Sequence, residues 1–170
     1  MTIRAVLLSL VSLLMLQGCG FHLRGKVDLP PSLDAVYIQS DDKKLATEIK
    51  NILEQSGASV VDNASTASAV IDIFQSDTTR EVLTLDDRGK ATSYNLKYVV
   101  KYRVNAASGD VLQADSSISM DRDFNFDPNQ VLQKEKEENF LLDSMREELA
   151  RRVLNRLSRI SLLPLTLRPA

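Results

Sequence analysis

The sequence has no tryptophan, one histidine and one cysteine among its 170 residues. A single cysteine cannot form an intramolecular disulfide, so the fold has to depend on its apolar core. The single histidine, His22, has no cluster of metal-ligating residues around it, which gives no support to a zinc centre or a histidine-based catalytic site. Aromatic residues make up only 5% of the chain, which argues against a platform for stacking bases or sugars.

Positive charge is not in excess either. The formal net charge of −2 differs from the basic surplus of general nucleic-acid binders and excludes that class. We find no nucleophile constellation and no phosphate-binding loop. The paired carboxylates, such as Asp41 with Asp42 and Asp86 with Asp87, are typical of helix caps and turns. The sequence therefore does not predict an enzyme.

The longest uncharged apolar run lies near the N-terminus. Ala5–Leu16 is twelve residues long, shorter than the roughly 20 residues that a membrane-spanning helix needs. Arg4 precedes the run and Gly18 closes it, which is the order of a secretory signal peptide. Residues 1–18 are thus predicted to be cleaved, so that 152 of the 170 residues remain and Cys19 becomes the first.

The sequence Leu16-Gln17-Gly18-Cys19 resembles a bacterial lipobox. The resemblance implies a diacylglyceryl thioether and an N-acyl chain on Cys19, and several acyl chains anchor a protein stably because each buried methylene contributes about 0.8 kcal/mol. Gly20, where an aspartate would favour retention at the inner membrane, implies the outer membrane. Residues 19–32 are predicted to be a tether and residues 33–170 a single domain.

The remaining chain shows helix and strand periodicities in a β-α-β-β-β-α order. The run Ser40-Asp41-Asp42 has N-cap chemistry, and Gly57 stands where a C-terminal left-handed residue is expected, which predicts a helix of about 14 residues. The predicted strands lie at 33–39, at 69–73 with a continuation over 80–85, at 94–104 and at 110–121. A capping box at Asp127, Pro128 and Gln130 opens a long amphipathic helix.

One strand has a dry face and a wet face. Apolar side chains occupy every second position of 94–104 in the order Tyr94, Leu96, Tyr98, Val100, Tyr102 and Val104. A sheet with one apolar face needs a helical layer on that face. The sequence therefore predicts an α+β two-layer sandwich of about four mainly antiparallel strands, with two helices packed on one face.

Basic residues gather on the wet face and at the turn before it. Lys97, Lys101 and Arg103 lie on the strand, while Arg88 and Lys90 lie in the turn. One interpretation is a solvated sheet face. The other is a site for an anionic partner such as phosphate, for which Arg offers a bidentate fork and Lys a compact point charge.

Three motifs carry a family resemblance. The run Gly18-Cys19-Gly20-Phe21-His22-Leu23-Arg24 closely resembles the start of the lipopolysaccharide-assembly lipoproteins of the LptE family, also called RlpB. Agreement continues in Gly89-Lys90-x-x-x-Tyr94 and in Arg122-x-Phe124-x-Phe126-Asp127. The resemblance extends over essentially the whole chain in the same element order.

The resemblance implies a lipid-anchored protein at the outer membrane that faces the periplasm. Its partners would be the LptD β-barrel, which it plugs and helps to fold, and lipopolysaccharide. A basic family position in the second helix aligns with Lys134. A second family position, in the turn, aligns with Asp87, so we expect the neighbouring Arg88, together with Lys90, to take the role of lipopolysaccharide contact. No cofactor is implied beyond the lipid on Cys19.

The sequence is also compatible with two other functional classes of protein. A generic envelope lipoprotein could scaffold another outer-membrane complex without binding lipopolysaccharide, and a small periplasmic hydrolase is the third class. Co-purification with a large β-barrel would separate the first two.

Cys19→Ala is expected to abolish acylation and membrane anchoring while leaving the domain folded, because Cys19 lies outside every predicted core element. Metabolic labelling with a palmitate analogue checks this. Label retained on the variant would overturn the lipoprotein prediction.

Overall fold

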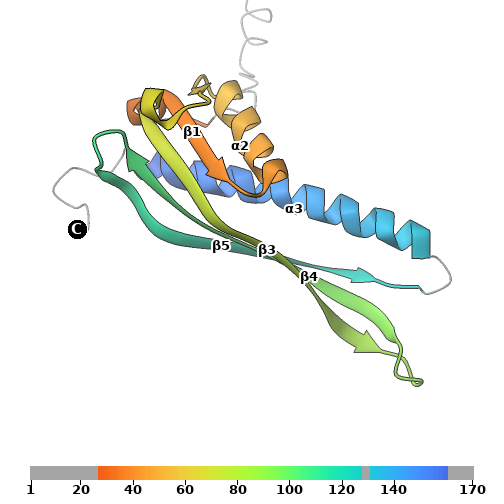
Figure 1. Cartoon of the computed structure of the whole chain (residues 1–170). Coiled ribbons are helices and arrows are strands. Elements are labelled where there is room, and N and C mark those ends of the chain that lie inside the picture. Colours follow the sequence, from red (N-terminus) through yellow and green to blue (C-terminus); the bar gives the residue numbers. More distant parts are fainter. Residues whose placement is uncertain (1–26, 128–130, 161–170) are drawn as a thin grey trace, which may run out of the picture.

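The computed structural model describes residues 27–127 and 131–160. Two short 3-10 turns, η2 (Pro31–Leu33) and η3 (Ala64–Thr66), accompany the main elements. In chain order these are β1 (Ala35–Ser40), α2 (Lys43–Gln55), β2 (Ser59–Val60), β3 (Ala69–Leu85), β4 (Ala91–Ala106), β5 (Val111–Asn125) and α3 (Val131–Ile160). Figure 1 shows α3 running along the long axis of the sheet.

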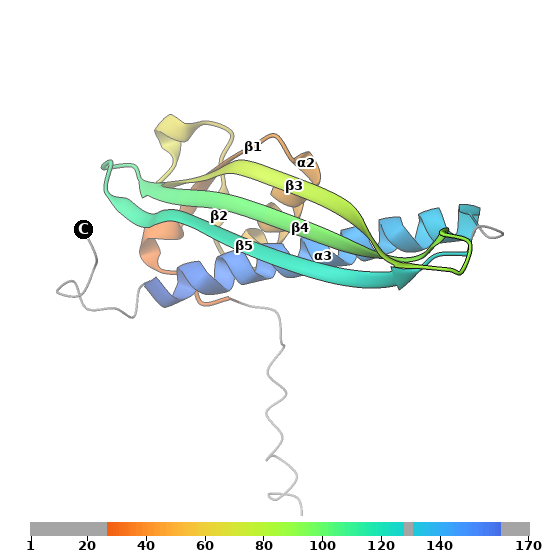
Figure 2. The same cartoon turned by 90° about the horizontal axis from the view of Figure 1, so that it is seen from below.

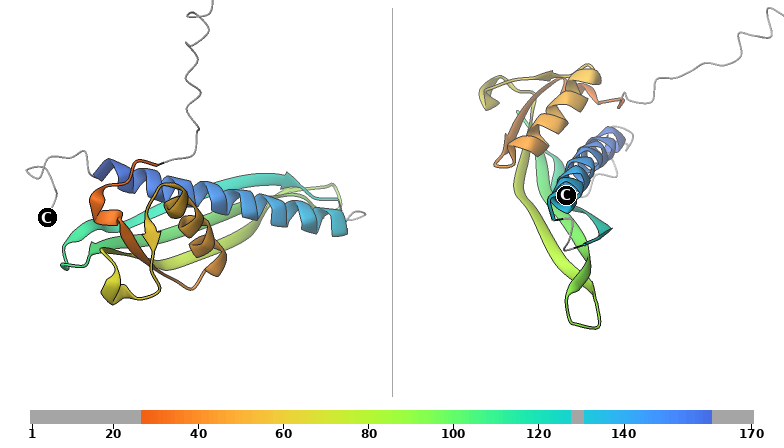
Figure 3. Two further views of the ribbon diagram at one scale, coloured as in Figure 1. Left: turned by 90° about the horizontal axis from the view of Figure 1, so that it is seen from above. Right: turned by 90° about the vertical axis from the view of Figure 1, so that its right-hand side faces the viewer.

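The elements form two layers. The sheet has the order β2-β1-β3-β4-β5, and α2 and α3 lie on the same face of it (Figures 2 and 3). The two long pairings, β3 with β4 and β4 with β5, are antiparallel. The predicted α+β sandwich with both helices on one face is therefore confirmed.

The sheet differs from the prediction at one edge. It has five strands rather than about four, and β1 pairs in parallel with both β2 and β3. Parallel neighbours need a crossover connection, and α2 supplies it between β1 and β2. The strand β2 has only two residues, too few to produce a periodic signal.

β3 is one strand of 17 residues across the polar break seen in the sequence. An extra residue, Phe74, is inserted between the pairs Ile73 with Tyr102 and Gln75 with Lys101. Such a bulge reverses which side chains face the core. Ser76 and Arg80 consequently share the helix-facing side with Ile73.

The core lies between β4 and the two helices. The alternation on β4 is confirmed, since Leu96, Tyr98, Val100, Tyr102 and Val104 are all buried and Tyr94 packs at the margin. The covering side chains come from α2 and from the later part of α3: Leu45, Ile49, Ile52 and Leu53, and Met145, Leu149, Val153, Leu154 and Leu157. On β5, apolar residues at even positions are expected to share the core side of the strand. Met120 is buried there and Leu112 and Ile118 pack against the core, whereas Ala114 is exposed beside a register shift.

Asp42 joins α2, β3 and β4 through one carboxylate. It caps α2 by accepting a hydrogen bond from the Leu45 N–H at 3.0 Å, and it accepts others from the hydroxyls of Ser76 on β3 (2.7 Å) and Tyr98 on β4. The Arg146 guanidinium of α3 lies over the Tyr98 ring. Partial burial opposes ionisation, but the hydrogen bonds from Tyr98, Leu45 and Ser76 outweigh it and lower the pKa of Asp42.

The ends of α2 match the sequence prediction. Gly57 has φ +94°, the left-handed conformation that glycine adopts without strain. The Ala58 N–H donates to the Leu53 carbonyl at 3.0 Å and the Gly57 N–H to the Glu54 carbonyl at 3.1 Å, which is the Schellman pattern of helix termination. In the predicted capping box of the last helix, Pro128 and Gln130 lie outside the described residues, as does Cys19.

Residues before the predicted end of the tether at residue 32 contact the domain, and Val27, the first described residue, is one of them. The Val27 N–H donates to the Ser56 hydroxyl at 3.1 Å, and Val27 and Leu29 pack against the core. The last residues of the segment assigned to the tether therefore lie on the domain.

Leu96→Ala should lower the free energy of unfolding by about 2 to 5 kcal/mol, because it leaves a cavity under the helices. Lys101→Ala on the opposite face should change it by less than about 0.5 kcal/mol. Urea denaturation of both variants checks the assignment. Equal destabilisation would contradict the orientation of β4.

The lowered pKa of Asp42 predicts that the free energy of unfolding falls in acid. Because its pKa is lowered in the folded state, its contribution is present above the unfolded-state value of about 3.9 and is lost as the pH falls through the lower folded-state value. Asp42→Asn should therefore make the unfolding free energy less dependent on pH below about pH 4, as measured by urea denaturation across that range. Asp41→Asn, at an exposed neighbour, should keep the wild-type dependence, and an unchanged profile in Asp42→Asn would contradict the assignment.

Candidate functional site

The β3–β4 turn positions two of the predicted site residues, Arg88 and Lys90. The Asp86 carboxylate accepts hydrogen bonds from the backbone N–H groups of Arg88 (2.9 Å) and Lys90 (2.8 Å), and Gly89 has φ +74°. Both basic side chains lie in the exposed part of the hairpin. Among the described residues, neither has an ion-pair partner.

The base of this hairpin is fixed to the body of the protein. Arg80 on β3 pairs with Glu138 of α3 at 2.9 Å and lies over the Tyr94 ring with 4.8 Å between its guanidinium carbon and the ring centroid. Tyr94 stacks on Phe124 and meets Phe126 edge-on. The hairpin projects beyond the rest of the sheet (Figure 1), and the aromatic cluster lies at its base. Bulges around Leu83 and Thr92 strengthen the local twist.

The third predicted residue, Lys134, lies within the first two turns of α3. Its ammonium pairs with Glu137 at 2.7 Å, and its side chain is 16% exposed. Figure 2 shows that the start of α3 and the β3–β4 turn lie at the same end of the molecule. The structure thus brings Arg88 and Lys90 together in one turn and places Lys134 at the same end on a different element.

Apolar side chains are exposed at this end. Seven large apolar residues are exposed in the described part of the chain, and five of them belong here: Val82, Leu83, Leu85, Leu132 and Phe140. Leu132 is 77% and Phe140 72% exposed. We call residues 82–92 and 132–140 the hairpin end; it combines unpaired positive charge with uncovered apolar surface, which is unusual for a free monomer surface.

The basic wet face of β4 is largely a solvated surface. Arg103 pairs with Asp72 at 2.9 Å and approaches Asp115 at 3.8 Å. These carboxylates neutralise the guanidinium charge of Arg103. For Arg103 this favours a solvated sheet face over a site for an anionic partner. Lys97 is exposed and Lys101 is partly exposed on the same face.

A second basic cluster was not predicted from the sequence. Arg152, Arg156 and Arg159 of α3 line a groove against β5. The signal was present, because these positions are four and three residues apart and so share one side of a helix. Helical spacing alone does not distinguish them from the other charged residues of an amphipathic helix, and only the position of β5 does.

Residues 27–127 and 131–160 contain no group of three or more His, Cys, Asp or Glu side chains arranged to hold a metal ion. No helix in those ranges combines the length and the apolar content that crossing a membrane requires.

Solved structures with this fold define its class. An uncharacterized lipoprotein B from Nitrosomonas europaea aligns with a TM-score of 0.70 at 26% identity, over 87% of this chain and 96% of that one. The rare lipoprotein B from Shewanella oneidensis aligns with a TM-score of 0.65 at 25% identity, over 75% and 96%. The fold is therefore that of a class of small bacterial proteins described as lipoproteins.

Sequence comparison identifies the family within that class. The family model described as LptE, lipopolysaccharide-assembly, matches residues 33–157, and the chain belongs to this family. The LPS-assembly lipoprotein LptE of Photorhabdus laumondii is 30% identical over 149 residues, covering 86% of this chain and 81% of the relative. The protein of the same name from Pectobacterium atrosepticum is 26% identical over 154 residues, covering 89% and 83%.

Proposed function

We propose that this protein is a lipid-anchored component of the lipopolysaccharide translocon, where it plugs the LptD β-barrel, assists its assembly and binds lipopolysaccharide. In this proposal Cys19 carries the acyl anchor, in the inner leaflet of the outer membrane. Family membership supports a role in lipopolysaccharide assembly. The ligand contact is proposed from the geometry of the hairpin end.

The amphiphilic character of the hairpin end carries the proposal. Lipopolysaccharide joins acyl chains to a phosphorylated sugar, so a binding surface must offer both apolar area and cations. Val82, Leu83 and Leu85, each more than half exposed, lie next to the turn that bears Arg88 and Lys90. Exposed apolar patches of this kind typically mark sites of interaction with another molecule.

The two kinds of basic side chain would act differently. The Arg88 fork can donate two parallel hydrogen bonds to one phosphate, whereas the ammonium groups of Lys90 and Lys134 act as point charges. Lys134 already pairs with Glu137, so phosphate would have to displace or share that carboxylate. We therefore expect Lys134 to contribute less than Arg88.

The remaining surface suits a position inside a water-filled barrel. The sheet face away from the helices carries Lys97, Lys101 and Arg103, while the apolar face is covered by α2 and α3. A domain with a dry core and a charged outer face can stand in an aqueous lumen without exposing its core.

Purification of the acylated protein from native membranes should recover LptD, whereas recovery of a different complex would favour the adaptor function.

Arg88→Glu combined with Lys134→Glu should weaken lipopolysaccharide binding by more than about tenfold, because a charge-assisted contact contributes about 1.5 to 3 kcal/mol. The chain without residues 1–19, which contains every described element, is titrated with lipopolysaccharide by calorimetry. Lys97→Glu combined with Lys101→Glu changes the net charge equally on the wet face of β4 and should keep near wild-type affinity.

Circular dichroism separates loss of binding from loss of fold in these variants. Unchanged affinity in a folded Arg88→Glu, Lys134→Glu protein would remove the hairpin end from the site. An equal loss in both double variants would mean that only net charge matters.

A further inference from the structure

The groove between α3 and β5 has a lining rich in hydrogen-bond donors. It has a volume of about 640 Å³ and is lined by Gln113, Ser117, Ile118, Arg152, Asn155, Arg156 and Arg159. This volume lies within the range of small-ligand sites, about 300 to 1,000 Å³. Three of the seven residues are arginines, and none of the described residues that line the groove is acidic.

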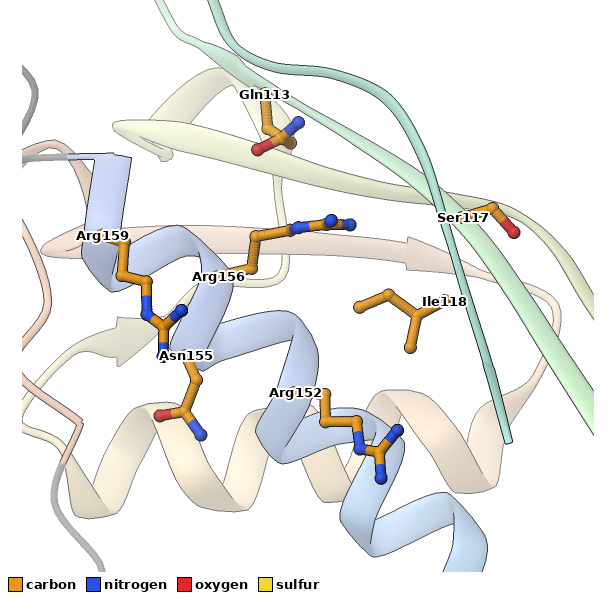
Figure 4. A pocket seen from close by; sticks show the side chains of 7 residues that line it. All are labelled: Gln113, Ser117, Ile118, Arg152, Asn155, Arg156 and Arg159. Carbon is orange, nitrogen blue, oxygen red and sulfur yellow. The ribbon is translucent and has the colours of Figure 1, made fainter. Parts of the chain in front are cut away.

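The arginines approach the groove from one side of one helix. Figure 4 shows Arg156 extending from α3 toward the strands, with Arg152 and Arg159 before and after it along the helix and Gln113 across the groove. At 1.5 Å per residue, the three positions span about 10 Å of the helix axis. The three positions therefore lie along one side of the helix and line the groove over about two turns.

The ion pairs of the domain leave much of this charge uncompensated. Arg152 pairs with Glu148 at 2.5 Å, but Arg156 and Arg159 have no carboxylate partner among the described residues. Elsewhere on α3 the arginines are paired, as Arg151 is with Glu147. A solvated helix face would account for one unpaired arginine more readily than for two that line the same groove.

Arg156 lies near a buried hydroxyl of β4. The Tyr102 side chain is fully buried, and its hydroxyl has no hydrogen bond of normal geometry among the described residues. Burial raises the pKa of Tyr102, and the nearby Arg156 guanidinium opposes that rise. Arg156 is itself exposed, so its guanidinium is accessible to a ligand in the groove.

We infer that this arginine groove is a second anion site, which binds a phosphate-bearing group. A phosphate has several terminal oxygens and can accept from more than one guanidinium fork, while Gln113 and Asn155 supply amide donors. Arg156 and Lys134 are 22 residues apart on α3, or about 33 Å along the axis, so the arginine groove is separate from the hairpin end and independent of the proposed function.

The test uses the mature acylated protein in a nonionic detergent, with inorganic pyrophosphate as the probe in calorimetry. The wild type should bind, and Arg156→Gln combined with Arg159→Gln should lose at least about tenfold in affinity. The matched control is Lys50→Gln combined with Arg151→Gln, which removes the same charge from exposed sites that pair with Glu54 and Glu147. It should bind pyrophosphate like the wild type.

Arg159→Gln alone is the second variant, because Arg156 lies near the buried Tyr102 hydroxyl and its loss can weaken the fold. Arg159 is exposed, so this variant should stay as stable to urea as the wild type while binding pyrophosphate several-fold more weakly. The hairpin variant Arg88→Glu, Lys134→Glu should retain pyrophosphate binding. Loss of binding in the hairpin variant but not in the groove variants would overturn the inference.

A second arm distinguishes a lipid headgroup from a soluble phosphate compound. Detergent micelles doped with phosphatidylglycerol or with phosphatidylcholine are compared as competitors of pyrophosphate. Competition by phosphatidylglycerol alone assigns the groove to an anionic headgroup, and no competition by either assigns it to a soluble phosphate compound. Failure of the wild type to bind either pyrophosphate or phosphatidylglycerol, or an equal loss in the groove and control variants, would overturn the inference.

Discussion

The packing of α3 on the apolar face of β4 is the interaction on which the rest of the structure depends. The buried residues of the helix run from Met145 to Leu157, so its first third extends past the region where the core is densest. β3 and β4 also extend beyond this region as a hairpin. The exposed apolar residues of the hairpin end lie in these two extensions, on the hairpin and on the first part of α3 itself. The arginine groove lies where the opposite part of α3 meets the edge strand β5.

The Asp42 network sets the position of the helical layer against the sheet. Tyr98 and Ser76 donate to the carboxylate that also caps α2, and Arg146 brings α3 to the same place. A partly buried carboxylate is stabilised there only because its hydrogen bonds offset the loss of hydration. The network therefore favours one arrangement of the two helices, whereas apolar packing alone would tolerate small shifts between them.

The sequence predicts those features that depend on local periodicity or local capping. The β4 alternation, the N-cap at Asp42 and the left-handed residue at Gly57 are all of this kind. The polar break in β3 hid its continuity, because Ser76 and Arg80 face Asp42 and Glu138, which are distant in the chain. The two-residue strand β2 has no period to detect. Arg156 and Arg159 form a groove only with β5, and that pairing of surfaces is a property of the tertiary structure.

The strand order leaves two long backbone edges in the described sheet. β1 pairs with β3 only as far as Ile73, so β3 is unpaired on that side from Phe74 onward, and β5 is unpaired along its outer side. Such edges can recruit a strand from another copy, and charged side chains or bulges oppose this. Asp115, Asp121 and Asp123 on β5 would face like charges in a self-paired edge, and the bulge at Leu83 twists the other. The same residues that disturb regular pairing thus protect the chain from aggregation.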